Sequence, residues 1–131
     1  MTKPPQLARV LLAGSFFRGA WGAVNDPGRM APAAAKLGLP EPEAMVLFNG
    51  AAQLTGATAM VLGIFPRLAA AGLAVSLVPT TLGAHRFWEI EDETARRTQL
   101  THFLKNLGLI GGLLAVAAWP GRSKTGPDSA A

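Results

Sequence analysis

Apolar residues gather in four long blocks along the chain, at residues 7–24, 44–65, 68–84 and 100–119. Polar, charged or Pro/Gly-rich stretches separate the blocks. At about 1.5 Å per helical residue, each block approaches the length needed to cross a hydrocarbon core of about 30 Å. The pattern predicts an all-α fold, a four-transmembrane-helix bundle with both termini on one side. A single domain is expected over residues 7–119, with disordered tails at 1–6 and 120–131.

The stretches between the blocks carry turn signals. The sequence NDPG at 25–28 predicts a turn. Residues 29–42 predict a long loop with a short helix over 32–37, lying either on the membrane surface or simply in solvent. The charged run 89–97 predicts a solvated hairpin. Pro79 removes a backbone donor from the third block and predicts a bend there.

Composition strengthens the membrane interpretation. Hydrophobic residues make up 50% of the chain and charged residues 15%, and the mean hydropathy is +0.29. The chain has no cysteine, which excludes disulfides and thiolate metal sites, and no tyrosine. Its net charge of +4 comes from scattered basic residues. We therefore expect contact with the lipid bilayer, anionic lipid included, and no binding to nucleic acid.

The first block has a competing interpretation, a cleaved signal peptide. Arg18 would lie inside the apolar core of that peptide, and no small-x-small cleavage site follows where one is needed. We therefore expect a span, in a multi-pass protein of the inner (cytoplasmic) membrane, with Arg9 snorkelling to the surface. The loops on the two sides carry five basic residues each, so the positive-inside rule does not decide orientation. Cytoplasmic termini are the expected arrangement.

Seven polar side chains lie in the spans or at their edge, all towards the predicted hairpin side: Arg18, Asn49, Gln53, His85, His102, Lys105 and Asn106. Six lie at depths of about 5–14 Å at 1.5 Å per residue, and the seventh lies at the boundary. Such residues are costly in lipid and face the bundle interior or snorkel.

Two interpretations of this cluster stay open. One is a polar pocket for a small anionic or quinone-like ligand, with Arg18 and Lys105 as donors and Gln53, His85 and Asn106 in the same connected site. The other is hydrogen bonding between helices, combined with snorkelling. A metal site is not expected, because two histidines supply too few ligands. No catalytic residue or covalent cofactor is indicated.

Several short motifs resemble those of the DoxX family of small four-helix bacterial membrane proteins. They are Arg9, LGLPEP at 37–42, Gly63 with RLAA at 67–70, HRFW at 85–88, FLKN at 103–106 and GGLL at 111–114. Where such proteins often carry a glutamate in the second span, this chain has Gln53. A proton-carrying role for that glutamate would not transfer to this chain.

The resemblance implies a location and a class of function. Family relatives are linked to membrane redox complexes, including a thiosulfate:quinone oxidoreductase. We therefore expect a membrane subunit of a quinone-linked redox complex, with quinone as a non-covalent ligand and a redox enzyme as partner subunit. The alternative is a non-enzymatic bundle that binds a partner protein or acts as a small permeability factor. Either form could be a homo-oligomer.

Overall fold

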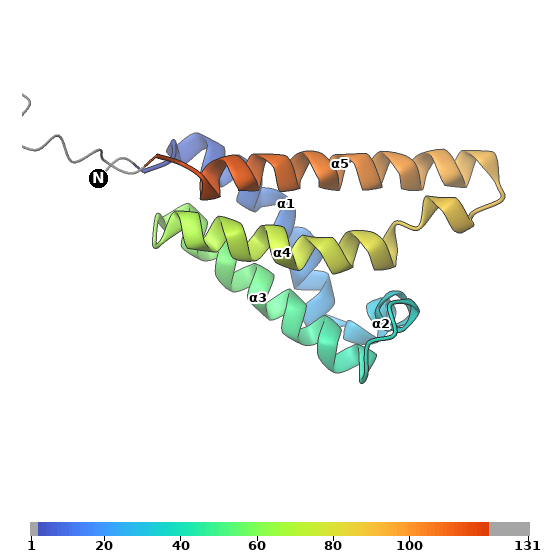
Figure 1. Cartoon of the computed structure of the whole chain (residues 1–131). Coiled ribbons are helices and arrows are strands. Elements are labelled where there is room, and N and C mark those ends of the chain that lie inside the picture. The colour runs from blue at the N-terminus through green and yellow to red at the C-terminus, as the bar shows by residue number, and fades with distance from the viewer. Residues whose placement is uncertain (1–2, 121–131) are drawn as a thin grey trace, which may run out of the picture.

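The computed structural model describes residues 3–120, which form five α-helices and one 3-10 helix and contain no strand. The elements are α1 (Gln6–Asn25), α2 (Pro27–Lys36), α3 (Pro42–Leu62), α4 (Pro66–Ala84), η1 (Phe87–Glu89) and α5 (Glu93–Ala117). The predicted all-α class is confirmed, and the predicted number of helices, four, is wrong. Figure 1 shows the start of α1 and the end of α5 at the same end of the bundle.

Three segments of the described chain are long and apolar enough to cross a membrane: Pro42–Leu62, Pro66–Glu89 and Glu93–Ala117. This supports a multi-pass membrane protein. The first predicted span forms α1, a helix of 20 residues, which is not among the three. Polar side chains such as those of Arg9, Ser15 and Arg18 lower its hydropathy. The described residues therefore show three candidate spans and not the four that were predicted.

Two connecting segments differ from expectation. The short helix predicted over 32–37 is part of a longer helix, α2, whose first residue, Pro27, is of the type best suited to a first helical position. The predicted hairpin 89–97 is shorter, because α5 already begins at Glu93. The Asp92 carboxylate caps that start by accepting a hydrogen bond from Ala95 N at 2.8 Å. Glu93 and Arg97 then form an ion pair one turn apart, which favours the polar first turns.

Helices next to one another in the chain pack side by side. The main contacts join α1 to α3, α3 to α4, and α4 to α5, while α2 packs on α3 and α4. The core is built from small residues interleaved with Phe16, Met60, Leu73 and Leu113. Gly56 allows α3 and α4 to approach closely, because an added Cβ would lie 3.1 Å from the Leu73 side chain. Small residues at helix interfaces permit contact of this kind.

Arg9 closes the end of the bundle where the described chain begins and ends. Its guanidinium donates from Nη1 to Met60 O at 2.7 Å and from Nε to Pro4 O at 3.1 Å. The side chain is buried, so the expected snorkelling of Arg9 is wrong. It places a positive charge at the C-terminus of α3, where the helix dipole favours one. Gly63 makes room for it, with φ +71° and no Cβ, since a Cβ would lie 2.6 Å from Nη1.

A second arginine acts in the same way at the same end. Arg67 Nε donates to Ala117 O at 3.0 Å and so caps the C-terminus of α5. Of the predicted tail 1–6, Pro4 is buried and Gln6 is the first residue of α1. Residues 1–2 and 121–131 lie outside the described part of the chain.

Candidate functional site

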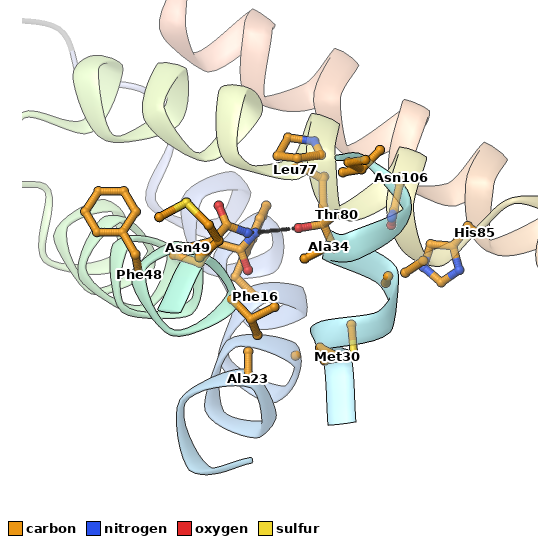
Figure 2. A pocket seen from close by; sticks show the side chains of 18 of the residues that line it. Phe16, Ala23, Met30, Ala34, Phe48, Asn49, Leu77, Thr80, His85 and Asn106 are labelled. Carbon is orange, nitrogen blue, oxygen red and sulfur yellow. Dashed lines mark hydrogen bonds between the residues drawn. The ribbon is translucent and has the colours of Figure 1, made fainter. Parts of the chain in front are cut away.

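A cavity of about 410 Å³ lies between the five α-helices. Figure 2 shows side chains that line it. This volume is within the range of sites that bind small molecules and cofactors. Most of the wall is apolar and includes Phe16, Met30, Ala34, Met45 and Leu77. The predicted residues that line the cavity come from α3, from the end of α4 and from α5: Asn49, Gln53, His85, Lys105 and Asn106.

Thr80 of α4 joins the two amide side chains of α3. Asn49 Nδ2 donates to Thr80 Oγ1 at 3.0 Å, and Gln53 Nε2 approaches the same oxygen at 3.4 Å. The hydroxyl in turn donates to Ser76 O, one turn earlier, at 3.2 Å. Asn49 and Gln53 share a face of α3 because they are four residues apart, so one hydroxyl can serve both.

Thr81 plays the corresponding part towards α5. Asn106 Nδ2 donates to Thr81 Oγ1 at 3.0 Å, and that hydroxyl donates to Leu77 O at 2.7 Å. Asn106 and Thr81 are only 4% and 2% exposed. Adjacent threonines thus carry polar contacts from α4 to two different helices. Neither threonine was predicted as part of the site, although two hydroxyls just after Pro79, within an apolar block, were the available signal.

His85 connects the cavity to the first half of α5. Its Nδ1 lies 2.8 Å from Gln99 Oε1, and its ring stacks on that of His102, with centroids 5.2 Å apart and planes at 24°. His102 touches His85 without lining the cavity. Lys105 lines the cavity and is exposed, which places its ammonium group at the rim.

Arg18 lies away from the cavity. It is exposed and is not part of the cavity wall, so the predicted joint action of Arg18 and Lys105 on one ligand has no counterpart in the geometry. Arg18 is two residues from both Phe16 and Ala20, which are buried. Two residues correspond to about 200° around a helix, so Arg18 points to the opposite side. Arg18 shares the predicted depth of the other polar residues but points in a different direction.

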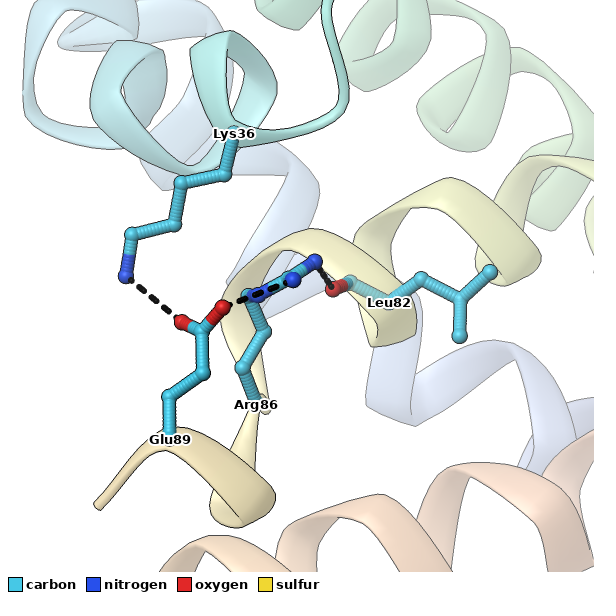
Figure 3. A network of polar contacts seen from close by, with 4 residues as sticks. All are labelled: Lys36, Leu82, Arg86 and Glu89. Carbon is cyan, nitrogen blue, oxygen red and sulfur yellow. Dashed lines mark hydrogen bonds and ion pairs between the residues drawn. The ribbon is translucent and has the colours of Figure 1, made fainter.

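An ionic network next to His85 ties α2 to the segment after α4 (Figure 3). Glu89 pairs with Arg86 at 2.7 Å and with Lys36 of α2 at 3.5 Å. Arg86 also donates from Nη1 to Leu82 O at 3.2 Å, and its guanidinium lies 5.1 Å from the ring centre of Trp88. The network holds α2, which supplies part of the cavity wall, against the end of α4.

Sequence comparison agrees with this architecture. The family model described as DoxX matches residues 5–86, more than half of the chain. The chain belongs to the DoxX family. No curated protein and no solved structure gives a significant match. The DoxX match covers the cavity residues of α1 to α4 and His85, whereas Lys105 and Asn106 follow the matched segment.

Proposed function

We propose that this DoxX protein is the membrane subunit of a redox complex and that the cavity between its helices binds a quinone. The observation that carries the proposal is a cavity with apolar walls and a buried to half-buried cluster of amides and hydroxyls. A quinone has a polar ring and an apolar tail, and both find matching surroundings there. Sites of this kind combine apolar walls with a few placed polar groups.

A partner would supply the electrons. The chain has neither cysteine nor tyrosine, and residues 3–120 contain no group of three His, Cys, Asp or Glu side chains placed to hold a metal. We therefore assign to this chain the binding and orientation of the quinone, and to a redox-active subunit the transfer of electrons. In the proposed arrangement the protein spans the inner membrane with both termini in the cytoplasm.

A separate observation favours a second function, a non-enzymatic bundle that binds a partner protein. Residues 91–98, which include the first turns of α5, are all exposed, and most of them are charged. Such a surface would suit a partner protein even if no quinone bound, as in a non-enzymatic bundle. Quinone content separates the two functions, because only the first requires a filled cavity.

Quinone content can be tested with two glycines of α1. An added Cβ meets nothing within 4 Å at Gly19, which lines the cavity, or at Gly14, which does not. Gly19→Leu should fill cavity space, while Gly14→Leu changes helix propensity equally. Protein would be purified from native membranes in mild detergent, and its extracted quinone quantified. We expect near-stoichiometric quinone in the wild type and Gly14→Leu, and a severalfold loss in Gly19→Leu.

Absence of quinone from folded wild-type protein would contradict the proposal. Equal quinone in both glycine variants would place the binding site elsewhere. Partner subunits recovered in the same purification, without quinone, would favour the non-enzymatic bundle.

A further inference from the structure

The hydroxyl protons of Thr80 and Thr81 fix the hydrogen-bond polarity of the cavity wall. Each hydroxyl has a single proton, and the nearest helical carbonyl takes it: Ser76 O at 3.2 Å for Thr80 and Leu77 O at 2.7 Å for Thr81. A carbonyl oxygen can only accept, so each hydroxyl oxygen is left to accept from any further partner.

The three amide side chains must therefore present their NH2 groups to the threonines. Asn49 and Gln53 donate to Thr80, and Asn106 donates to Thr81. With the hydroxyl protons given to the helical carbonyls, a flipped amide would set two acceptors against each other. The carbonyl oxygens of all three amides consequently point away from the threonines.

Those carbonyl oxygens face the cavity. Within residues 3–120 no hydrogen bond reaches Asn49 Oδ1, Gln53 Oε1 or Asn106 Oδ1. They are not sealed from solvent, because the one fully buried side-chain atom without a partner in that range is Arg86 Nε. Gln53 is 6% exposed and Asn106 4%, and both line the cavity, so the accessible space beside them is the cavity itself.

The buried part of the wall is thus rich in acceptors. Three carbonyl oxygens offer six lone pairs, while each amide nitrogen has already given one of its two protons. The ammonium of Lys105 is a strong donor, but it lies at the exposed rim.

We infer that the cavity binds the reduced, dihydroxy form of a quinone more tightly than the oxidised form. The inference rests on the proposed function. A quinol has two O–H donors, which the amide oxygens can accept. A quinone, the form with two electrons and two protons fewer, has two carbonyl groups that only accept, and only the one remaining proton of each amide is left for them. The site therefore holds the reduced form more tightly than the oxidised form.

Binding of three compounds to the purified full-length protein tests the inference. The compounds are a short-chain ubiquinone, its quinol under anaerobic conditions, and the dimethyl ether of the quinol, which keeps the ring but lacks both donors. Each compound is dialysed to equilibrium against the protein in detergent micelles, and its distribution gives the dissociation constant. Two additional hydrogen bonds should make the quinol bind about tenfold more tightly than either other compound.

Each outcome has a distinct meaning. Equal or tighter binding of the quinone would overturn the inference and leave the proposed function standing. Equal binding of the quinol and its dimethyl ether would also overturn it, because the hydroxyl protons would then contribute nothing. Failure of all three compounds to bind to folded protein would overturn the proposed function, and this inference with it.

Thr80→Val tests the role of the hydroxyl directly. Valine has a similar shape but cannot accept, so the amides of Asn49 and Gln53 become free to turn their NH2 groups to a ligand. The quinol preference should fall to within about twofold, because the lost selectivity is that of one or two hydrogen bonds. Thr58→Val is the matched control, since Thr58 makes the same bond to a carbonyl one turn earlier (Leu54 O, 2.8 Å) on an exposed surface.

A second variant protects the test against misfolding. Gln53→Leu removes one acceptor and should weaken quinol binding about threefold while leaving quinone binding nearly unchanged. A wild-type quinol preference in folded Thr80→Val and Gln53→Leu would overturn the inference. A merely structural role for these residues would weaken the binding of both redox forms alike.

Discussion

Replacing Arg9 by methionine tests whether a buried charge holds one end of the bundle together. Methionine keeps an unbranched apolar stem but cannot donate to Met60 O or to Pro4 O, which Arg9 reaches at 2.7 and 3.1 Å. Arg18 offers a matched control on the same helix, because it is exposed. Arg18→Met removes the same charge from α1 without removing an interhelical contact.

The expected magnitude follows from these contacts. A hydrogen bond from a charged donor contributes about 1.5–3 kcal/mol. Met60 O still accepts a hydrogen bond from Gly63 N at 3.2 Å, so the variant leaves this carbonyl with one of its two donors. We expect Arg9→Met to lower the free energy of unfolding by about 2–4 kcal/mol. Arg18→Met should change it by less than about 0.5 kcal/mol, as exposed substitutions usually do.

Thermal unfolding in one detergent, followed by circular dichroism at 222 nm, measures the difference. For a domain of this size a loss of 1 kcal/mol lowers Tm by roughly 4 °C, so Arg9→Met should unfold about 8–16 °C earlier than Arg18→Met. Arg9→Lys should recover only part of the loss, since an ammonium lacks the planar fork that bridges two carbonyls. Equal Tm values for Arg9→Met and Arg18→Met would refute the reasoning.

Three further predictions concern single features of the fold. Gly63→Ala should cost about 1–2 kcal/mol or more, because residue 63 has a left-handed backbone and a Cβ there would meet Arg9; Gly72→Ala, with nothing near its Cβ, should be neutral or stabilising in the same unfolding assay. Thr81→Val should destabilise more than Asn106→Leu, because only the first leaves a buried amide proton unpaired, and unfolding in one detergent compares the two. Alkaline carbonate should leave the protein in the membrane pellet, and release into the supernatant would contradict the three membrane-spanning segments.

Topology also remains a prediction that reporter fusions can check. Fusions after Lys3 and at the end of α5 should report one side of the membrane, and a fusion at Arg96 the other. Opposite sides for the first two fusions would mean that α1 does not cross the bilayer. This is the point to test, because α1 is not among the three segments apolar enough to span.

The sequence by itself determined the helices and their approximate order. Blocks of apolar residues predicted α1, α3, α4 and α5 to within a few residues at most ends, because helix formation in an apolar environment depends on local composition and on prolines and glycines that mark the boundaries. It also placed Asn49, Gln53, His85, Lys105 and Asn106 near one level of the bundle, where the structure finds them around one cavity. The sequence predicted only part of α2, as a short helix over 32–37, and missed the first turns of α5, because these segments lack a long apolar run.

Only the tertiary structure decided which way each polar side chain points. Arg9 and Arg18 look alike in sequence, yet Arg9 is buried against the C-terminus of α3 and Arg18 faces outward. The difference depends on which side of α1 meets α3, and that is set by the packing of Phe16 and the small residues around it. The pairing of Thr80 and Thr81 with amides on two other helices likewise depends on the rotation of α4 about its axis. Helix rotation is a sum over many contacts between distant segments, so no local pattern in the sequence carries it.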